Sequence, residues 1–139
     1  MSRILETVLW GMAIGQACVA VLNLNLVRIL GWKAEVAGMS VLVREVFQIH
    51  TWFISLTLLI FAVLTWRFGS VMVSGEEMTA RWLAVAMGIF WGVRAVLQVT
   101  HYSVSHWHGN RARTVVHFTL LLVYTAWAAV YLGVGTRIL

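Results

Sequence analysis

Four long apolar stretches with few charges dominate the pattern of hydrophobic and polar positions along the chain. They cover about residues 7–27, 41–66, 78–102 and 114–132. An α-helix needs about 20 mostly apolar residues to cross roughly 30 Å of hydrocarbon, and each stretch reaches that length. The pattern therefore predicts four transmembrane α-helices.

Short polar segments connect these stretches, and short connections make consecutive helices antiparallel neighbours. The sequence thus predicts an all-α fold, an integral membrane four-helix bundle of up-down-up-down topology. It predicts a single membrane domain over residues 1–139, with both termini on the same side. Between the second and third stretches, Ser74 is followed three residues later by Glu77, which favours an N-cap at Ser74 for the third helix.

Composition agrees with a location in a membrane. Of the 139 residues, 61% are hydrophobic and 11% are charged, whereas a soluble domain carries roughly 25% charged residues. The ten Lys and Arg residues stand singly, mostly near the ends of the apolar stretches, where they meet lipid headgroups. No basic block points to nucleic acid as a partner. We expect a multi-pass integral membrane protein whose main partner is the lipid bilayer.

Polar side chains inside the apolar stretches gather in one half of the membrane. At about 1.5 Å per residue, all four helices place them near the face that carries the first and third connections. Steps of three and four residues turn most of them toward the inside of a bundle, although His50 lies off this stripe on the second helix. The members of this polar layer are Asn23, Glu45, Gln48, Arg94, Gln98, His117 and Tyr124.

Arg94 lies deepest among the charged residues, about 12 Å inside the hydrocarbon. A guanidinium is costly there and cannot lose its proton, so it needs a partner or water. One hypothesis pairs Arg94 with Glu45, which would hold the second and third helices in register. The other hypothesis makes Arg94 part of a site for an anion, a carboxylate or a haem propionate, or part of a proton path.

Two histidines extend the functional hypothesis. His101 and His117 are predicted to face inward at similar depth on adjacent helices, as ligation of haem b or of a metal would require. With Arg94 and Gln98 they form a candidate site for haem, a metal or a quinone. Histidines that are satisfied by the backbone or by a carboxylate would give the same pattern, so a structural role stays open.

Three further histidines are weaker candidates. His106 and His108 are separated by one residue in the third connection, a spacing compatible with metal chelation. His50 lies at a depth suitable for cofactor binding, but its side chain is predicted to point away from the inward polar stripe of the second helix. None of the five histidines belongs to a haem-attachment or metalloenzyme motif, and no catalytic residue is assigned.

Small residues mark two helix faces that allow close approach. Gly11 and Gly15 are four residues apart on the first helix, and Ala84, Gly88 and Gly92 follow the same spacing on the third. In membranes such spacing favours tight helix packing. The contact can lie inside one bundle, or it can join the chain to another membrane subunit or to a second copy.

Three classes of function follow from these patterns. The first is a helix-packing accessory protein or subunit of a larger membrane complex, which needs only the small-residue faces and structural pairing of the polar layer. The second is a redox site or a site for a lipid-soluble substrate, built on His101, His117, Arg94 and Gln98. The third is proton or small-solute transport, which the apolar second half of the membrane span disfavours.

Overall fold

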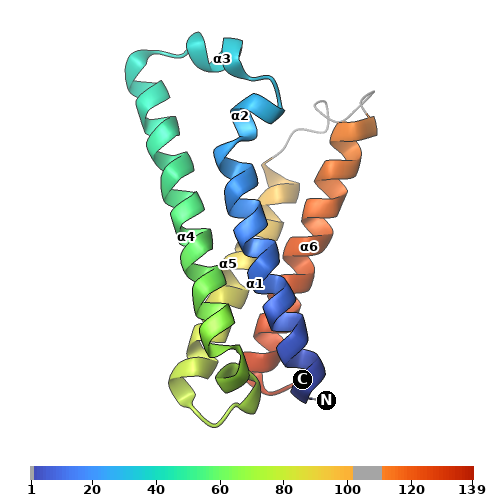
Figure 1. Ribbon diagram of the computed structural model, residues 1–139. Helices are drawn as coiled ribbons and strands as arrows, with labels where there is room; N and C mark the ends of the chain where they lie inside the picture. The colour runs from blue at the N-terminus through green and yellow to red at the C-terminus, as the bar shows by residue number, and fades with distance from the viewer. Residues whose placement is uncertain (1, 102–110) are drawn as a thin grey trace. The chain divides into compact units, whose positions relative to one another are not determined.

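The computed structural model describes the backbone of residues 2–101 and 111–139 and the side chains of residues 2–101 and 114–139. All regular secondary structure in these residues is helical (Figure 1). The helices are α1 (Ser2–Leu24), α2 (Leu26–Ile29), α3 (Lys33–Ala37), α4 (Val41–Ser74), α5 (Met78–Thr100) and α6 (Arg111–Thr136). The prediction of an all-α fold is confirmed.

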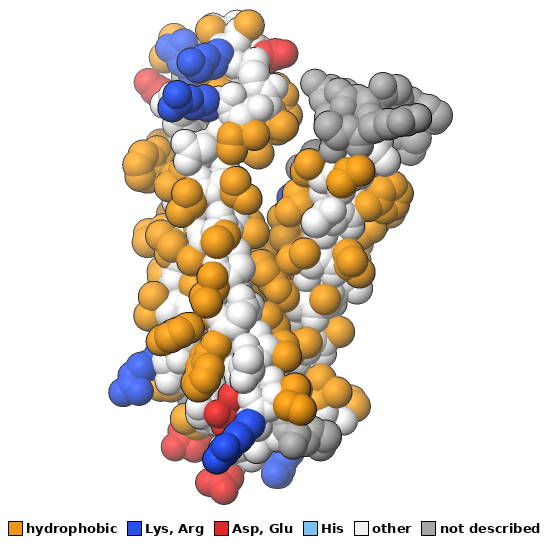
Figure 2. Space-filling view, turned by 45° about the vertical axis from the view of Figure 1, so that its right-hand side comes forward, with side chains coloured by type: hydrophobic (Ala, Val, Ile, Leu, Met, Phe, Trp, Pro, Cys, Tyr) orange, Lys and Arg blue, Asp and Glu red, His pale blue; other side chains and the backbone are white. Residues whose placement is uncertain are grey.

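Four segments are long and apolar enough to cross a membrane: Ser2–Leu24, Val41–Ser74, Met78–Thr100 and Thr114–Thr136. Figure 2 shows hydrophobic side chains along the long helices and charged side chains toward their ends. The four predicted long apolar helices are therefore present, each with the length and composition to span a membrane. The short helices α2 and α3 lie in the first connection, where the sequence analysis expected no helix.

The second span is longer than expected, because α4 continues to Ser74 instead of ending near residue 66. Its end is set by Gly75, which has φ +63° and whose N–H bonds to the Val71 carbonyl. A glycine in this left-handed conformation commonly ends an α-helix. Ser74 thus completes α4, and its hydroxyl donates to Val71 O at 3.0 Å. The predicted N-cap at Ser74 is wrong, since α5 begins after Glu77.

The chain divides into two compact units, Met1–Gly69 and Ser70–Leu139. Each unit is described by itself below. A single domain, the order of the four helices in one bundle and the common side of the two termini stay predictions.

In the first unit, α1 and α4 run antiparallel. Near the end of α1, the Asn23 side-chain amide donates to Ser55 Oγ at 2.9 Å and to Thr51 O at 3.1 Å. Near its start, the rings of Trp10 and Trp66 lie with centroids 5.9 Å apart. The early residue Trp10 of α1 thus lies beside the late residue Trp66 of α4, and Asn23 at the end of α1 lies beside Thr51, so the two helices are antiparallel.

In the second unit, α5 and α6 form an antiparallel hairpin with very close packing. A Cβ atom on Gly88 would lie 2.7 Å from Leu132 Cγ and 3.0 Å from the Leu132 nitrogen. A Cβ atom on Gly135 would lie 2.9 Å from the Arg81 carbonyl oxygen. The helices can approach this closely only because both positions lack a side chain. The Ala84–Gly88–Gly92 face is therefore used inside the unit, against α6.

Candidate functional site

Arg94 is the centre of a polar cluster on the α5–α6 hairpin. Its side chain is half-buried, and Nη1 donates to Gln98 Oε1 at 2.8 Å, one turn further along α5. The guanidinium carbon lies 5.1 Å from the centroid of the Tyr124 ring on α6. A charge-assisted hydrogen bond and a cation–π contact thus fix Arg94 between the two helices.

Gln98 links Arg94 to His117. Its side chain is 3% exposed, and its Nε2 lies 3.0 Å from His117 Nδ1. Arg94 has only donors, so it must face the amide oxygen, and the NH₂ group of Gln98 then faces the imidazole. His117 Nδ1 is therefore the acceptor, and a neutral His117 carries its proton on Nε2.

An aromatic cluster packs beside this network. Trp91 is 1% exposed, stacks on Tyr124 at a centroid distance of 5.1 Å and meets Trp127 edge-on at 4.6 Å. The indole Nε1 of Trp91 is buried and has no hydrogen-bond partner among the described residues. A buried N–H without a partner is costly. It marks a donor that the hairpin itself does not satisfy.

The charge of Arg94 has no counter-ion in its own unit. The acidic residues of the second unit are Glu76 and Glu77. Glu77 lies 17 positions before Arg94, which corresponds to about 25 Å along α5 and is out of reach of the side chain. Three of the four residues in the predicted cofactor site, Arg94, Gln98 and His117, are nevertheless brought together by the hairpin.

His101 and His50 do not join this network. His101 is exposed at the C-terminal end of α5, with Nδ1 3.0 Å from the hydroxyl of Thr100. His50 belongs to the first unit, where it is exposed and donates from Nδ1 to the Val46 carbonyl at 3.0 Å. His106 and His108 lie outside the described residues. Over the described side chains, no group of three or more His, Cys, Asp and Glu residues could hold a metal ion.

In the first unit, the polar contact between helices is made by Asn23, Thr51 and Ser55. Gln48 lies one heptad before Ser55 on the same side of α4, yet it is exposed, and so is Glu45. The reason is that α1 ends at Leu24, so α4 has no long partner helix in this unit beside its first turns. An inward position of Glu45 and Gln48 within a four-helix bundle stays a prediction.

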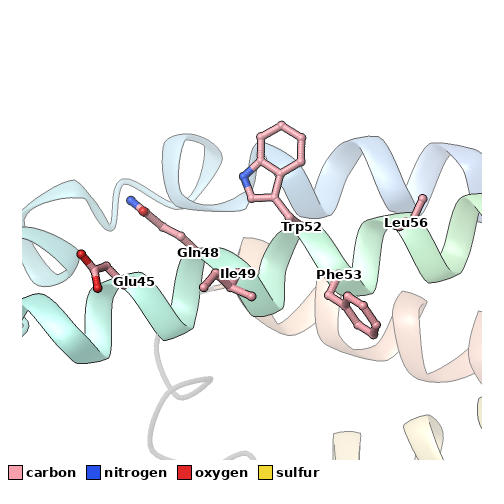
Figure 3. Close-up of a pocket in the computed structure, with 6 residues that line it drawn as sticks. All are labelled: Glu45, Gln48, Ile49, Trp52, Phe53 and Leu56. Atoms are coloured by element: carbon pink, nitrogen blue, oxygen red, sulfur yellow. The ribbon is translucent and has the colours of Figure 1, made fainter.

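One exposed face of α4 borders a shallow, open hollow of about 580 Å³, and all of its lining residues lie on this one helix (Figure 3). A smaller hollow of about 140 Å³ between α4 and the end of α1 shares Gln48 and Trp52 with it. The larger hollow is lined by Glu45, Gln48, Ile49, Trp52, Phe53 and Leu56. It combines a carboxylate, an amide and an indole with three apolar side chains on one helix.

The length and composition of the four long helices are those of an α-helical multi-pass membrane protein. Searches against protein-family models, curated proteins and solved structures found no match.

The sequence analysis did not predict the aromatic cluster. Its signal was present, because Trp91 precedes Arg94 by three residues and Trp127 follows Tyr124 by three, which places each pair on one helix face.

Proposed function

We propose that this membrane protein binds a lipid-soluble carboxylate at Arg94, and that a long-chain fatty acid is the simplest such ligand. The observation that supports the proposal is the guanidinium of Arg94, which is held in place by Gln98 and Tyr124 but has no acidic partner in its own unit. A charge at this depth in a membrane needs an opposite charge or water. A ligand carboxylate supplies the opposite charge.

The chemistry of the cluster favours an oxygen acceptor. Arg94 has five N–H donors, of which one bonds to Gln98, and a guanidinium matches a carboxylate with two parallel hydrogen bonds. The buried N–H of Trp91 adds a donor in the same cluster. The aromatic rings of Trp91, Tyr124 and Trp127 give the apolar part of a ligand a rigid surface.

The same geometry makes His117 a poor ligand for haem or a metal. Its Nδ1 accepts from Gln98, and in this tautomer Nε2 carries the proton. Ligation through Nε2 would move the proton to Nδ1, where it would face the NH₂ group of Gln98. Gln98 cannot turn over without placing that NH₂ group against Arg94. We therefore favour a lipid-soluble ligand at this site over haem or a metal.

One observation supports a second candidate, a subunit of a larger membrane complex. Gly11 is exposed, and a Cβ atom there would meet nothing within 4 Å. Gly11 thus leaves room for a helix from another protein, whereas Gly88 on the third span is covered by α6.

The test measures binding of radiolabelled oleate to the purified protein in lipid nanodiscs. We expect oleate to bind saturably. Methyl oleate should not compete with it, because the ester lacks the negative charge. Arg94→Gln should weaken the affinity at least about tenfold, since a hydrogen bond between charged groups contributes about 1.5–3 kcal/mol. Arg94→Lys should give an intermediate affinity, because it keeps the charge but loses the paired donors.

The matched control is Arg81→Gln, which removes another arginine of the same hairpin. The Arg81 side chain donates to the Gly135 carbonyl oxygen at 3.2 Å. It should leave the affinity for oleate unchanged. Circular dichroism and gel filtration check that each variant is folded. The proposal fails if the wild-type protein does not bind oleate saturably, or if folded Arg94→Gln binds it as well as the wild-type protein does.

A further inference from the structure

The indole N–H of Trp91 is a hydrogen-bond donor without an acceptor inside the α5–α6 hairpin. Trp91 is 1% exposed, and its Nε1 has no hydrogen-bond partner among the residues that the structure describes. An indole nitrogen can only donate, and a buried donor without an acceptor is destabilising. A phenylalanine would fill a similar space without this penalty. The N–H therefore points to an acceptor that a ligand brings.

Trp91 and Arg94 lie close enough to contact one elongated ligand. They are three residues apart on α5, about 4.5 Å along the helix axis, and therefore share a helix face. Both also contact Tyr124 on α6, because the Trp91 ring and the Arg94 guanidinium carbon each lie 5.1 Å from the centroid of the Tyr124 ring. The indole and the guanidinium are thus separated by no more than twice that distance.

The polar groups of this cluster call for an acceptor and not for a further donor. Arg94 and Trp91 only donate, while the Gln98 oxygen accepts from Arg94 and its NH₂ group faces His117. Arg94 holds a ligand carboxylate through two parallel hydrogen bonds, so the N–H of Trp91 is left for a second oxygen. A carbonyl oxygen only accepts, whereas a hydroxyl adds a proton that needs an acceptor of its own. A carbonyl group therefore fits best.

The packing beside Trp91 leaves room for such an oxygen. Gly92 is half-buried, and outside its own helical turn a Cβ atom there would meet only Ala128 Cβ, at 3.9 Å. One turn earlier, a Cβ atom on Gly88 would lie 2.7 Å from Leu132 Cγ. The two helices are thus less tightly packed at the level of Trp91 than at Gly88, and a small group can enter there without moving the backbone.

We propose that the ligand at Arg94 is an oxo fatty acid, whose chain carries a carbonyl group near the carboxylate. The carboxylate pairs with Arg94, the carbonyl oxygen accepts from Trp91 Nε1, and the chain runs toward the middle of α5. Trp91 then determines specificity, because it favours a chain with an oxygen over a plain chain. This ligand class rests on the function proposed for Arg94 and narrows it.

The test measures how stearate, 5-oxostearate and 12-oxostearate compete with radiolabelled oleate for the protein in lipid nanodiscs. We expect 5-oxostearate to bind about fivefold more tightly than stearate, because it adds a hydrogen bond to a donor that is otherwise unpaired. 12-Oxostearate should bind as stearate does, since its carbonyl lies too far along the chain to meet Trp91 when the carboxylate is at Arg94. This comparison needs only the wild-type protein.

Trp91→Phe removes the N–H and keeps an aromatic ring. Stearate and 5-oxostearate should then bind equally, whatever the change in either affinity. The matched control is Trp82→Phe, which removes the indole N–H of a tryptophan that is 66% exposed near the start of α5. It should keep the fivefold preference, and circular dichroism checks that both variants are folded.

Three results overturn this ligand class: equal binding of stearate and 5-oxostearate to the wild-type protein, an equal gain with 12-oxostearate, or a preference that persists in folded Trp91→Phe. The proposed function survives each of them if stearate binding still depends on Arg94. If no fatty acid binds in a way that depends on Arg94, both proposals fail.

Discussion

At the scale of single residues, Gln98 has a role that few other side chains could fill. It lies between Arg94, which needs an acceptor, and His117, whose Nδ1 accepts in the neutral form. A carboxamide presents an acceptor oxygen and a donor NH₂ on one planar group at any ordinary pH. Buried on α5, it satisfies both neighbours at once, so its loss affects two polar groups.

We expect Gln98→Leu to lower the free energy of unfolding by about 1–3 kcal/mol, because it leaves two polar groups without their partner. Gln98→Glu should recover most of this loss, since a carboxylate still accepts from Arg94 and can pair with a protonated His117. Chemical denaturation in detergent measures both. Thr125→Val is the control and should change stability by less than about 0.5 kcal/mol, since that hydroxyl is exposed and bonds its own helix at Leu121 O. A loss in Gln98→Leu no larger than the control's would contradict the assigned role.

A double-mutant cycle tests the hypothesis that Arg94 pairs with Glu45. The proposed function assigns Arg94 to a ligand carboxylate and not to Glu45, so the stability losses of Arg94→Leu and Glu45→Leu should add within about 0.5 kcal/mol. A structural ion pair would instead make the double variant more stable than the sum predicts, because each single change leaves an uncompensated charge. Strong coupling between the two changes would therefore favour the ion pair over the ligand site at Arg94.

At the scale of helices, the spacing of small residues decides how close α5 and α6 can come. Gly88→Ala should destabilise the hairpin by about 1–3 kcal/mol, since the new methyl group would meet the backbone nitrogen of Leu132. Gly92→Ala should be nearly neutral, because its Cβ would lie 3.9 Å from Ala128 Cβ, an ordinary contact. Denaturation of both variants in the same detergent makes the comparison. If Gly92→Ala cost as much as Gly88→Ala, steric contact would not be the cause.

The sequence predicts where the helices lie along the chain, but it does not predict how far neighbouring helices are shifted along each other. The apolar stretches were enough to place four spans, and the spacing of three and four residues put Arg94, Gln98 and His117 on facing sides. Helix periodicity does not determine how far one helix slides along another. That offset depends on which side chains are small at the contact, and it brings His117 opposite Gln98 instead of His101.

The end of α4 was missed for a local reason. Gly69 lies in the predicted connection between residues 66 and 78, but a Cβ there would meet Leu9 Cβ at 3.6 Å, an ordinary packing distance inside a helix pair. The glycine that ends α4 is Gly75, which has the positive φ. Two glycines six residues apart look alike in a sequence, and only the backbone conformation distinguishes them.

At the scale of the whole molecule, the predicted up-down-up-down order can be tested by labelling. In a Cys18→Ala background, single cysteines replace Ser2, Glu76, Leu139 and Glu35. We expect a membrane-impermeant maleimide to label the first three from one side of the membrane and the fourth from the other, because four spans reverse direction at each connection. Labelling of the Ser2 and Glu35 positions from the same side would refute this topology.

The direction of the hydrogen bonds around Gln98 also limits what the molecule can carry. A chain of polar groups relays protons only if each member can pass its proton on and the whole chain can then turn around. Here Arg94 keeps its protons and always donates, so Gln98 and His117 are held in one orientation. The permanent positive charge of Arg94 is expected to repel a second proton, which disfavours the proton-transport alternative.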